Sequence, residues 1–144
     1  MLTKIVVGTD GSDTAGEAID FAIELAERHG AALLVASSYR PVSEYRLQKE
    51  QKEAPSDVQW SLNPFEDVEA TLKAAEDKAL ERGVAVTSEA RRGDPADLLC
   101  EIAAEVGADL LIVGSKGMER RVLGSVPNKV SHKAPCSVLI VKTS

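Results

Sequence analysis

Five short apolar runs alternate along this chain with four stretches whose apolar residues recur every three or four positions. The short runs have the length and composition of buried β-strands and cover residues 3–8, 31–37, 84–90, 110–114 and 136–142. The periodic stretches are typical of amphipathic helices and cover residues 13–28, 64–82, 95–106 and 125–133. Regular alternation of strands and helices predicts an α/β fold, with a five-stranded parallel sheet and helices on both of its faces.

Two of the predicted strands are expected to lie side by side where the winding of the sheet reverses. Residues 3–8 and 110–114 both end in a glycine, Gly8 and Gly114, that is followed by polar residues. In doubly wound sheets the ligand crevice lies at the carboxyl ends of the strands at this reversal. We therefore expect Asp10 to face the segment after Gly114 across a crevice. Residues 84–90 alternate apolar and polar side chains, which favours a position at the sheet edge.

The chain has 144 residues, which suits a single domain spanning residues 1–144. Residues 38–63 differ from the rest because they are polar, contain Pro41 and Pro55, and show no clear periodicity. A segment of this length without secondary structure is uncommon in a compact domain and is usually functional or mobile. We expect a long loop here.

The segment after the fourth predicted strand has the pattern of a phosphate-binding loop. Gly114, Gly117 and Gly124 precede Ser125, and a helical pattern begins there. A strand, a glycine loop and a helix N-terminus together present free backbone N–H groups to an anion. The alternative is an ordinary strand-to-helix turn in which the glycines serve only the turn.

Several other functions are disfavoured by the sequence. The segment lacks the lysine of a Walker A loop, and neither glycine-ended strand is followed by G-x-G-x-x-G. A net charge of −6 argues against nucleic acid as a partner. The chain has no apolar run long enough to span a membrane and no signal peptide, so we expect a cytoplasmic protein. Cys100 and Cys136 lack a C-x-x-C context and are expected to be buried free thiols.

No catalytic or metal-binding arrangement is evident. His29 and His132 lie on predicted helices without metal-ligand partners at i+4, and Ser125 has no histidine base in its pattern. Glu119 is the one carboxylate in the glycine segment that could serve magnesium. We therefore predict binding rather than catalysis, with no catalytic residues and no resident metal.

The whole chain resembles the universal stress protein family. The resemblance rests on IVVGTDGS at the first strand, on the glycines from Gly114 to Ser125, and on VPNKVSHKAPCSVLIV near the end. It implies a Rossmann-like fold, and the nucleotide-binding branch of the family carries G-x2-G-x9-G-[S/T]. Six residues separate Gly117 from Gly124 here in place of nine, so the loop has less slack to wrap a triphosphate.

The resemblance also implies the residues that contact an adenine nucleotide. Asp10 would accept the ribose hydroxyls, although it could instead cap the following helix. Ala36 would meet the adenine through its backbone, and Lys116 is within reach of the phosphates by its position. The implied binding set is Gly8, Thr9, Asp10, Ala36, Val113, Gly114, Lys116, Gly117, Gly124, Ser125 and Val126.

ATP, with or without Mg²⁺, is the first expected ligand. Cyclic AMP is its rival because the short loop suits a smaller phosphate group. The family pairs its last strand across a two-fold axis, so Val138, Leu139, Ile140 and Val141 are expected to form a homodimer interface. The expected role is regulation in a stress response. A weak ATPase or self-phosphorylating protein, and an interaction module without nucleotide, stay open as alternatives.

Overall fold

The computed structural model describes residues 2–10, 13–39, 65–115 and 125–143. The prediction of a loop over residues 38–63 therefore falls almost wholly outside the described residues. Each predicted strand and helix is present, in the predicted order. The elements are β1 (Lys4–Gly8), α1 (Asp13–His29), β2 (Ala32–Tyr39), α4 (Phe65–Glu81), β3 (Val86–Arg92), α5 (Pro95–Val106), β4 (Leu110–Gly114), α6 (Ser125–Lys133) and β5 (Ser137–Val141).

The five strands form one parallel sheet in the order β3-β2-β1-β4-β5. β1 lies between β2 and β4, so the winding reverses between β1 and β4 as the two glycine-ended strands predicted. β3 is at an edge, which confirms the interpretation of its alternating sequence. Half-buried charges lie on this strand: Arg91 forms ion pairs with Glu89 on the same strand and with Glu105 on α5.

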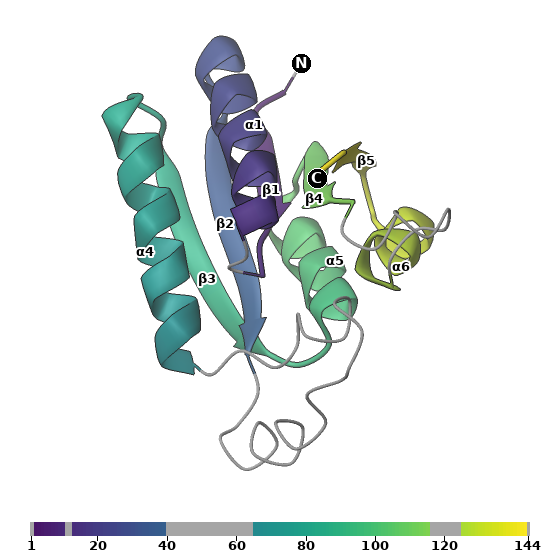
Figure 1. Ribbon diagram of the computed structural model, residues 1–144. Coiled ribbons are helices and arrows are strands. Elements are labelled where there is room, and N and C mark those ends of the chain that lie inside the picture. The colour runs from purple at the N-terminus through teal and green to yellow at the C-terminus, as the bar shows by residue number, and fades with distance from the viewer. Residues whose placement is uncertain (1, 11–12, 40–64, 116–124, 144) are drawn as a thin grey trace.

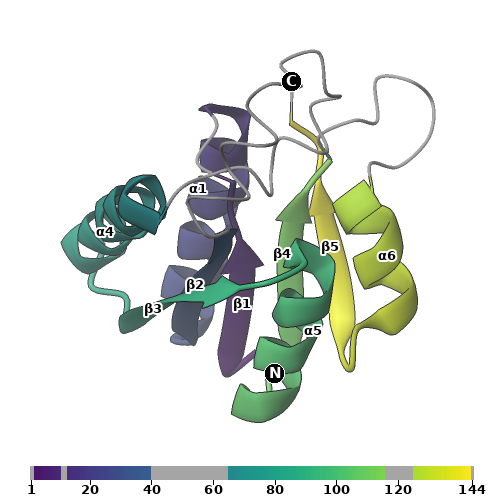
Figure 2. The same cartoon turned by 90° about the horizontal axis from the view of Figure 1, so that it is seen from below.

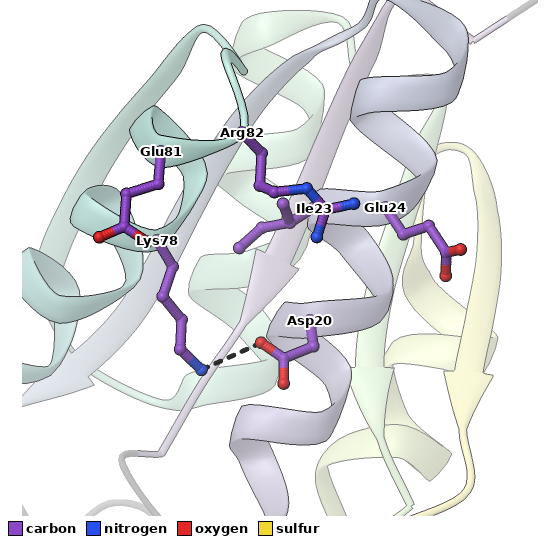
Figure 3. Close-up of a pocket in the computed structure, with 6 residues that line it drawn as sticks. All are labelled: Asp20, Ile23, Glu24, Lys78, Glu81 and Arg82. Atoms are coloured by element: carbon purple, nitrogen blue, oxygen red, sulfur yellow. Dashed lines mark hydrogen bonds and ion pairs between the residues drawn. The ribbon is translucent and has the colours of Figure 1, made fainter.

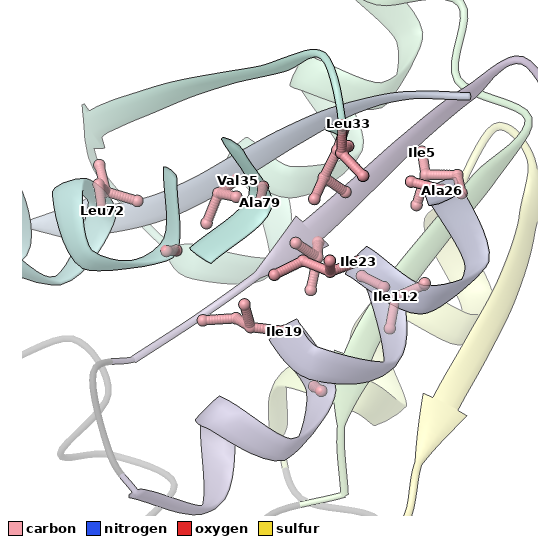
Figure 4. Close-up of a cluster of buried hydrophobic side chains, with 14 of the residues drawn as sticks. Ile5, Ile19, Ile23, Ala26, Leu33, Val35, Leu72, Ala79 and Ile112 are labelled. Atoms are coloured by element: carbon pink, nitrogen blue, oxygen red, sulfur yellow. The ribbon is translucent and has the colours of Figure 1, made fainter. Parts of the chain in front are cut away.

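Helices cover both faces of the sheet (Figure 1, Figure 2). α1 and α4 pack on one face, where Ile5, Leu33 and Ile112 from three strands meet Ile23 of α1 in a single apolar cluster (Figure 4). α5 and α6 pack on the other face, where Val6, Leu111 and Val113 meet Leu99 and Val130. Burial of these two clusters provides most of the driving force for folding.

β3 begins two residues later than the sequence pattern predicts. The N–H of Val84 donates to the carbonyl of Ala79 at 3.0 Å, so Val84 still belongs to the turn that ends α4. Gly83 permits this turn because its φ is 73°, a conformation that side chains with a Cβ rarely adopt. The strand also ends later than predicted, at Arg92, so Arg91 is part of the sheet.

The two cysteines are free thiols in the structure, but they are half-buried and not fully buried as expected. Both lie at the margin of the cluster between the sheet and α5 and α6. Partial burial raises the pKa of both thiols, because a thiolate is poorly solvated there. Within the described ranges, no helix has the length and apolar content needed to span a membrane.

Asp109 ties the beginning of β4 to the beginning of β1. Its carboxylate accepts hydrogen bonds from the Thr3 N–H at 2.8 Å, the Thr3 hydroxyl at 2.7 Å and the Lys4 N–H at 2.9 Å. These bonds favour the charged form and lower the pKa of Asp109 to about 2. Because the folded pKa lies below the unfolded one, the carboxylate stabilises the fold above about pH 4. That contribution is lost as the pH falls from about 4 to 2.

We therefore expect Asp109→Asn to melt at a lower temperature than the wild type at pH 7, since the amide loses the charge that strengthens these bonds. The difference should shrink as the pH falls and should nearly vanish at pH 2. Thermal denaturation followed by circular dichroism between pH 2 and pH 7 measures it. An equal difference at every pH would contradict the role given to the charge.

Candidate functional site

The carboxyl ends of β2, β1 and β4 meet at one edge of the sheet. Gly8 pairs with Ala36 at the end of β1, and the preceding residue, Val7, pairs with Ile112 of β4. Val113 and Gly114 follow directly at the end of β4. The fold therefore brings together four residues of the implied binding set, Gly8, Ala36, Val113 and Gly114, and Thr9 and Asp10 follow directly after β1.

Hydrogen bonds fix the chain where it leaves β1. The N–H of Thr9 donates to the carbonyl of Ala36 at 3.0 Å, and the hydroxyl of Ser37 donates to the carbonyl of Thr9 at 2.6 Å. Thr9 is fully buried and Asp10 is 7% exposed. The carboxylate of Asp10 is thus carried on a rigid segment at the point where the sheet reverses.

Gly8 has a packing role that sequence reasoning did not detect. A Cβ placed on Gly8 would lie 2.7 Å from Cδ1 of Leu99, whose side chain is fully buried in α5. Glycine at this position lets α5 approach the end of β1. The sequence pointed to Gly8 as a ligand neighbour, and this contact gives an independent reason for the glycine.

The end of β4 is held by the C-terminal strand. The N–H of Ser115 donates to the carbonyl of Val141, and the Ser115 hydroxyl accepts from the N–H of Thr143, each at 2.9 Å. Thr143 also packs against Gly114, where an added Cβ would lie 3.2 Å from its methyl group. Ser115 is only 3% exposed, yet the sequence offered no signal for it because its partner is distant in the chain.

Packing and ion pairs set the position of α6. Val126 in its first turn is buried in the same cluster as Val113. Lys129 lies 3.1 Å from carboxylate oxygens of both Asp94 and Asp97 on α5, and these contacts raise the pKa of Lys129. Asp94 also caps α5 by accepting from the Asp97 N–H. The helix that follows the glycine segment is thereby fixed relative to α5.

Of the residues implied to contact the phosphates, three lie outside the described residues and a fourth, Ser125, begins α6. Lys116, Gly117 and Gly124 lie outside the described residues, as does Glu119. Ser125 is the first residue of α6, so its backbone is at a helix N-terminus, where N–H groups lack partners within the helix. No group of three His, Cys, Asp or Glu side chains is placed to hold a metal ion in the part of the chain that the structure describes.

A hollow lies between α1 and α4, away from these residues (Figure 3). Its volume is about 510 Å³, and it is lined by Asp20, Ile23, Glu24, Lys78, Glu81 and Arg82. Lys78 lies 3.0 Å from Asp20, and Arg82 pairs with Glu27. This groove reaches the C-terminal end of α4, which precedes the start of β3, so it lies toward the opposite edge of the sheet from Asp10. These two ion pairs are exposed to solvent, and such pairs contribute about 0–1 kcal/mol each.

A model of the universal stress protein family matches residues 1–142. The chain belongs to the universal stress protein family. A universal stress protein of Mycobacterium tuberculosis is 36% identical over 144 residues, covering 97% of this chain and 96% of the relative. The resemblance found in the sequence is confirmed.

Solved structures of universal stress proteins have the same fold. One, in complex with cAMP, is 35% identical with a TM-score of 0.75, covering 99% of this chain and 98% of that chain. Another, from Archaeoglobus fulgidus in complex with dAMP, is 24% identical with a TM-score of 0.67 and full coverage of both chains. The second likeness supports the five-stranded fold alone.

Proposed function

We propose that this universal stress protein binds one adenine nucleotide at the carboxyl ends of β1, β2 and β4 and acts as a stress-response regulator. The observation that carries the proposal is that Asp10 follows β1 at the reversal of a doubly wound sheet, where β1 lies beside β4 and Val126 of α6 packs with Val113. A relative with 35% identity and the same fold is known in complex with cAMP. In this arrangement the start of α6 receives the phosphate and Asp10 receives the ribose.

ATP and cyclic AMP are the two ligands to compare. ATP is the first expectation from the sequence, with Mg²⁺ bound through the phosphates. Cyclic AMP is favoured by the ligand of the 35% identical relative and by the short glycine segment, in which six residues separate Gly117 from Gly124. Binding without turnover is proposed for either ligand, and slow hydrolysis or self-phosphorylation at Ser125 is the enzymatic alternative.

The test is calorimetric titration of nucleotide-free protein with ATP and with cyclic AMP. We expect micromolar affinity for at least one of them. Gly124→Val should abolish that binding, because a branched side chain in the glycine segment blocks close approach of a phosphate to the backbone. Incubation with ATP and Mg²⁺ and assay of released phosphate separates binding from turnover.

The control is Gly16→Val, which places the same side chain in α1, where an added Cβ meets nothing within 4 Å. This variant should bind nucleotide as the wild type does. Failure of the wild type to bind either nucleotide would contradict the proposal and would favour the interaction module. A cytoplasmic location is proposed with this function.

We also propose a homodimer formed through β5. It is an edge strand, and Val138, Leu139, Ile140 and Val141 are each half-buried within one chain. An apolar edge strand is open to pairing with another copy, and a lysine on such a strand opposes that pairing. Ile140→Lys should therefore shift the protein from dimer to monomer in sedimentation equilibrium while its thermal transition stays cooperative. A wild type that sediments as a monomer would contradict the proposal.

A further inference from the structure

The side chain of Ser38 is fully buried in β2, and its hydroxyl has no hydrogen bond to any of the described residues. Among the described residues it is the sole buried side-chain nitrogen or oxygen in this condition. Folded proteins rarely leave such a group unsatisfied, because its lost hydration is not replaced.

Two other buried hydroxyls at this edge of the sheet have partners in the backbone. Ser37 donates to the carbonyl of Thr9, and Ser115 accepts from the N–H of Thr143. The guanidinium of Arg91, which pairs across the strands with Ser38, is engaged by Glu89 and Glu105. Among the described residues the lack of a partner is therefore specific to Ser38, and a bound ligand could supply the missing hydrogen bond.

The position of Ser38 indicates which part of a ligand it would meet. Side chains alternate along a strand, so Ser38 shares the face of Ala36, which belongs to the cluster beneath α5 and α6. Ser38 also lies two residues beyond the last rung that pairs β1 with β2, at the carboxyl edge. The sheet order at this edge is β2-β1-β4, so β2 lies about 10 Å from β4.

A nucleotide with its phosphate at the start of α6 and its ribose at Asp10 would place its base over β2. We propose that the Ser38 hydroxyl forms a hydrogen bond with the purine base. A hydroxyl both donates and accepts, so it can serve a ring nitrogen or the 6-amino group of adenine. This inference rests on the proposed function and adds a side-chain contact with the base to the backbone contact implied for Ala36.

The experiment compares Ser38→Ala with the wild type in two measurements. Removal of an unsatisfied buried hydroxyl should raise the melting temperature of the nucleotide-free protein by about 2–6 °C. The same substitution should weaken AMP binding in calorimetry by about three- to tenfold. Binding of ribose 5-phosphate, which has no base, should be the same for both proteins. A gain in stability together with a loss of affinity is the signature of a group kept for a ligand.

Ser37→Ala is the matched control for stability, because its hydroxyl has a partner and its loss should lower the melting temperature. Higher stability of Ser38→Ala with unchanged AMP affinity would overturn the inference. Lower stability would also overturn it, by showing that a buried water already satisfies the hydroxyl. Equal weakening for AMP and ribose 5-phosphate would place the contact on the sugar phosphate and reject the contact with the base. If the wild type binds none of AMP, ATP and cyclic AMP, the proposed function itself fails, and the variants are not needed to show it.

Discussion

Gly8→Ala is expected to destabilise this universal stress protein by about 1–3 kcal/mol, because the added methyl group overpacks a filled core. The new Cβ would lie 2.7 Å from Cδ1 and 3.1 Å from Cδ2 of Leu99. Leu99 is fully buried, so its side chain cannot turn toward solvent to make room. Either α5 must move away from the sheet or Leu99 must leave its preferred rotamer. Urea denaturation followed by circular dichroism measures the free energy of unfolding.

A double-mutant cycle with Leu99→Ala tests whether this contact is the cause. Leu99→Ala alone should cost about 2–5 kcal/mol through the cavity that it leaves. In the double variant the methyl group at position 8 occupies part of that cavity. We therefore expect the combined cost to be at least about 1 kcal/mol smaller than the sum of the single costs. Additive costs would show that the two positions do not compete for space.

Gly16→Ala is the matched control for Gly8→Ala. Gly16 lies inside α1, and an added Cβ meets nothing within 4 Å. Alanine should stabilise the helix there by about 0.5–1 kcal/mol, because it loses less backbone entropy on folding than glycine does. The same substitution at two glycines should thus have opposite signs.

Asp10→Asn is expected to weaken ATP binding by about ten- to hundredfold while leaving the stability of the nucleotide-free protein almost unchanged. The carboxylate can accept hydrogen bonds from both ribose hydroxyls, and bonds to a charged acceptor are the strong ones. The amide has one acceptor oxygen and presents donors where the hydroxyls donate. Asparagine is as good a helix cap as aspartate, so a role as cap for α1 is preserved. Calorimetry for binding and thermal denaturation for stability measure the two effects.

The choice of ligand sharpens this test. In ATP both ribose hydroxyls are free, whereas in cyclic AMP the 3′ oxygen is part of the cyclic phosphate. Asp10 can therefore accept from two hydroxyls of ATP but from one of cyclic AMP. We expect the loss on Asp10→Asn to be larger for ATP than for cyclic AMP. Unchanged affinity for both nucleotides would show that Asp10 serves only as a cap.

Two parts of the proposed site are held in place by the fold. Thr9, directly before Asp10, is fixed by hydrogen bonds to β2, and α6 is fixed by Val126 and by the ion pairs of Lys129. The start of α6 therefore has a defined position relative to Asp10 before any ligand binds. Preorganisation of this kind lowers the ordering cost of binding.

The sequence alone determined the architecture of this protein. The alternation of apolar runs with helical periodicity predicted each strand and helix of the described residues, and the glycine-ended strands 3–8 and 110–114 predicted the reversal between β1 and β4. These signals are local, because burial of a strand or of one helix face imposes its period on consecutive residues. The motifs around Asp10 and Ser125 carried the family resemblance for the same reason, since each is a short continuous stretch.

The tertiary structure decided the features that depend on residues distant in the chain. The contact of Gly8 with Leu99, the bond from Thr143 to Ser115, and the unpartnered hydroxyl of Ser38 have no signature in consecutive residues. The start of β3 likewise shifted because Val84 bonds back to α4. A serine that is satisfied and one that is not have the same place in a strand pattern. They differ in what the folded chain puts beside them, and only the packed molecule determines that.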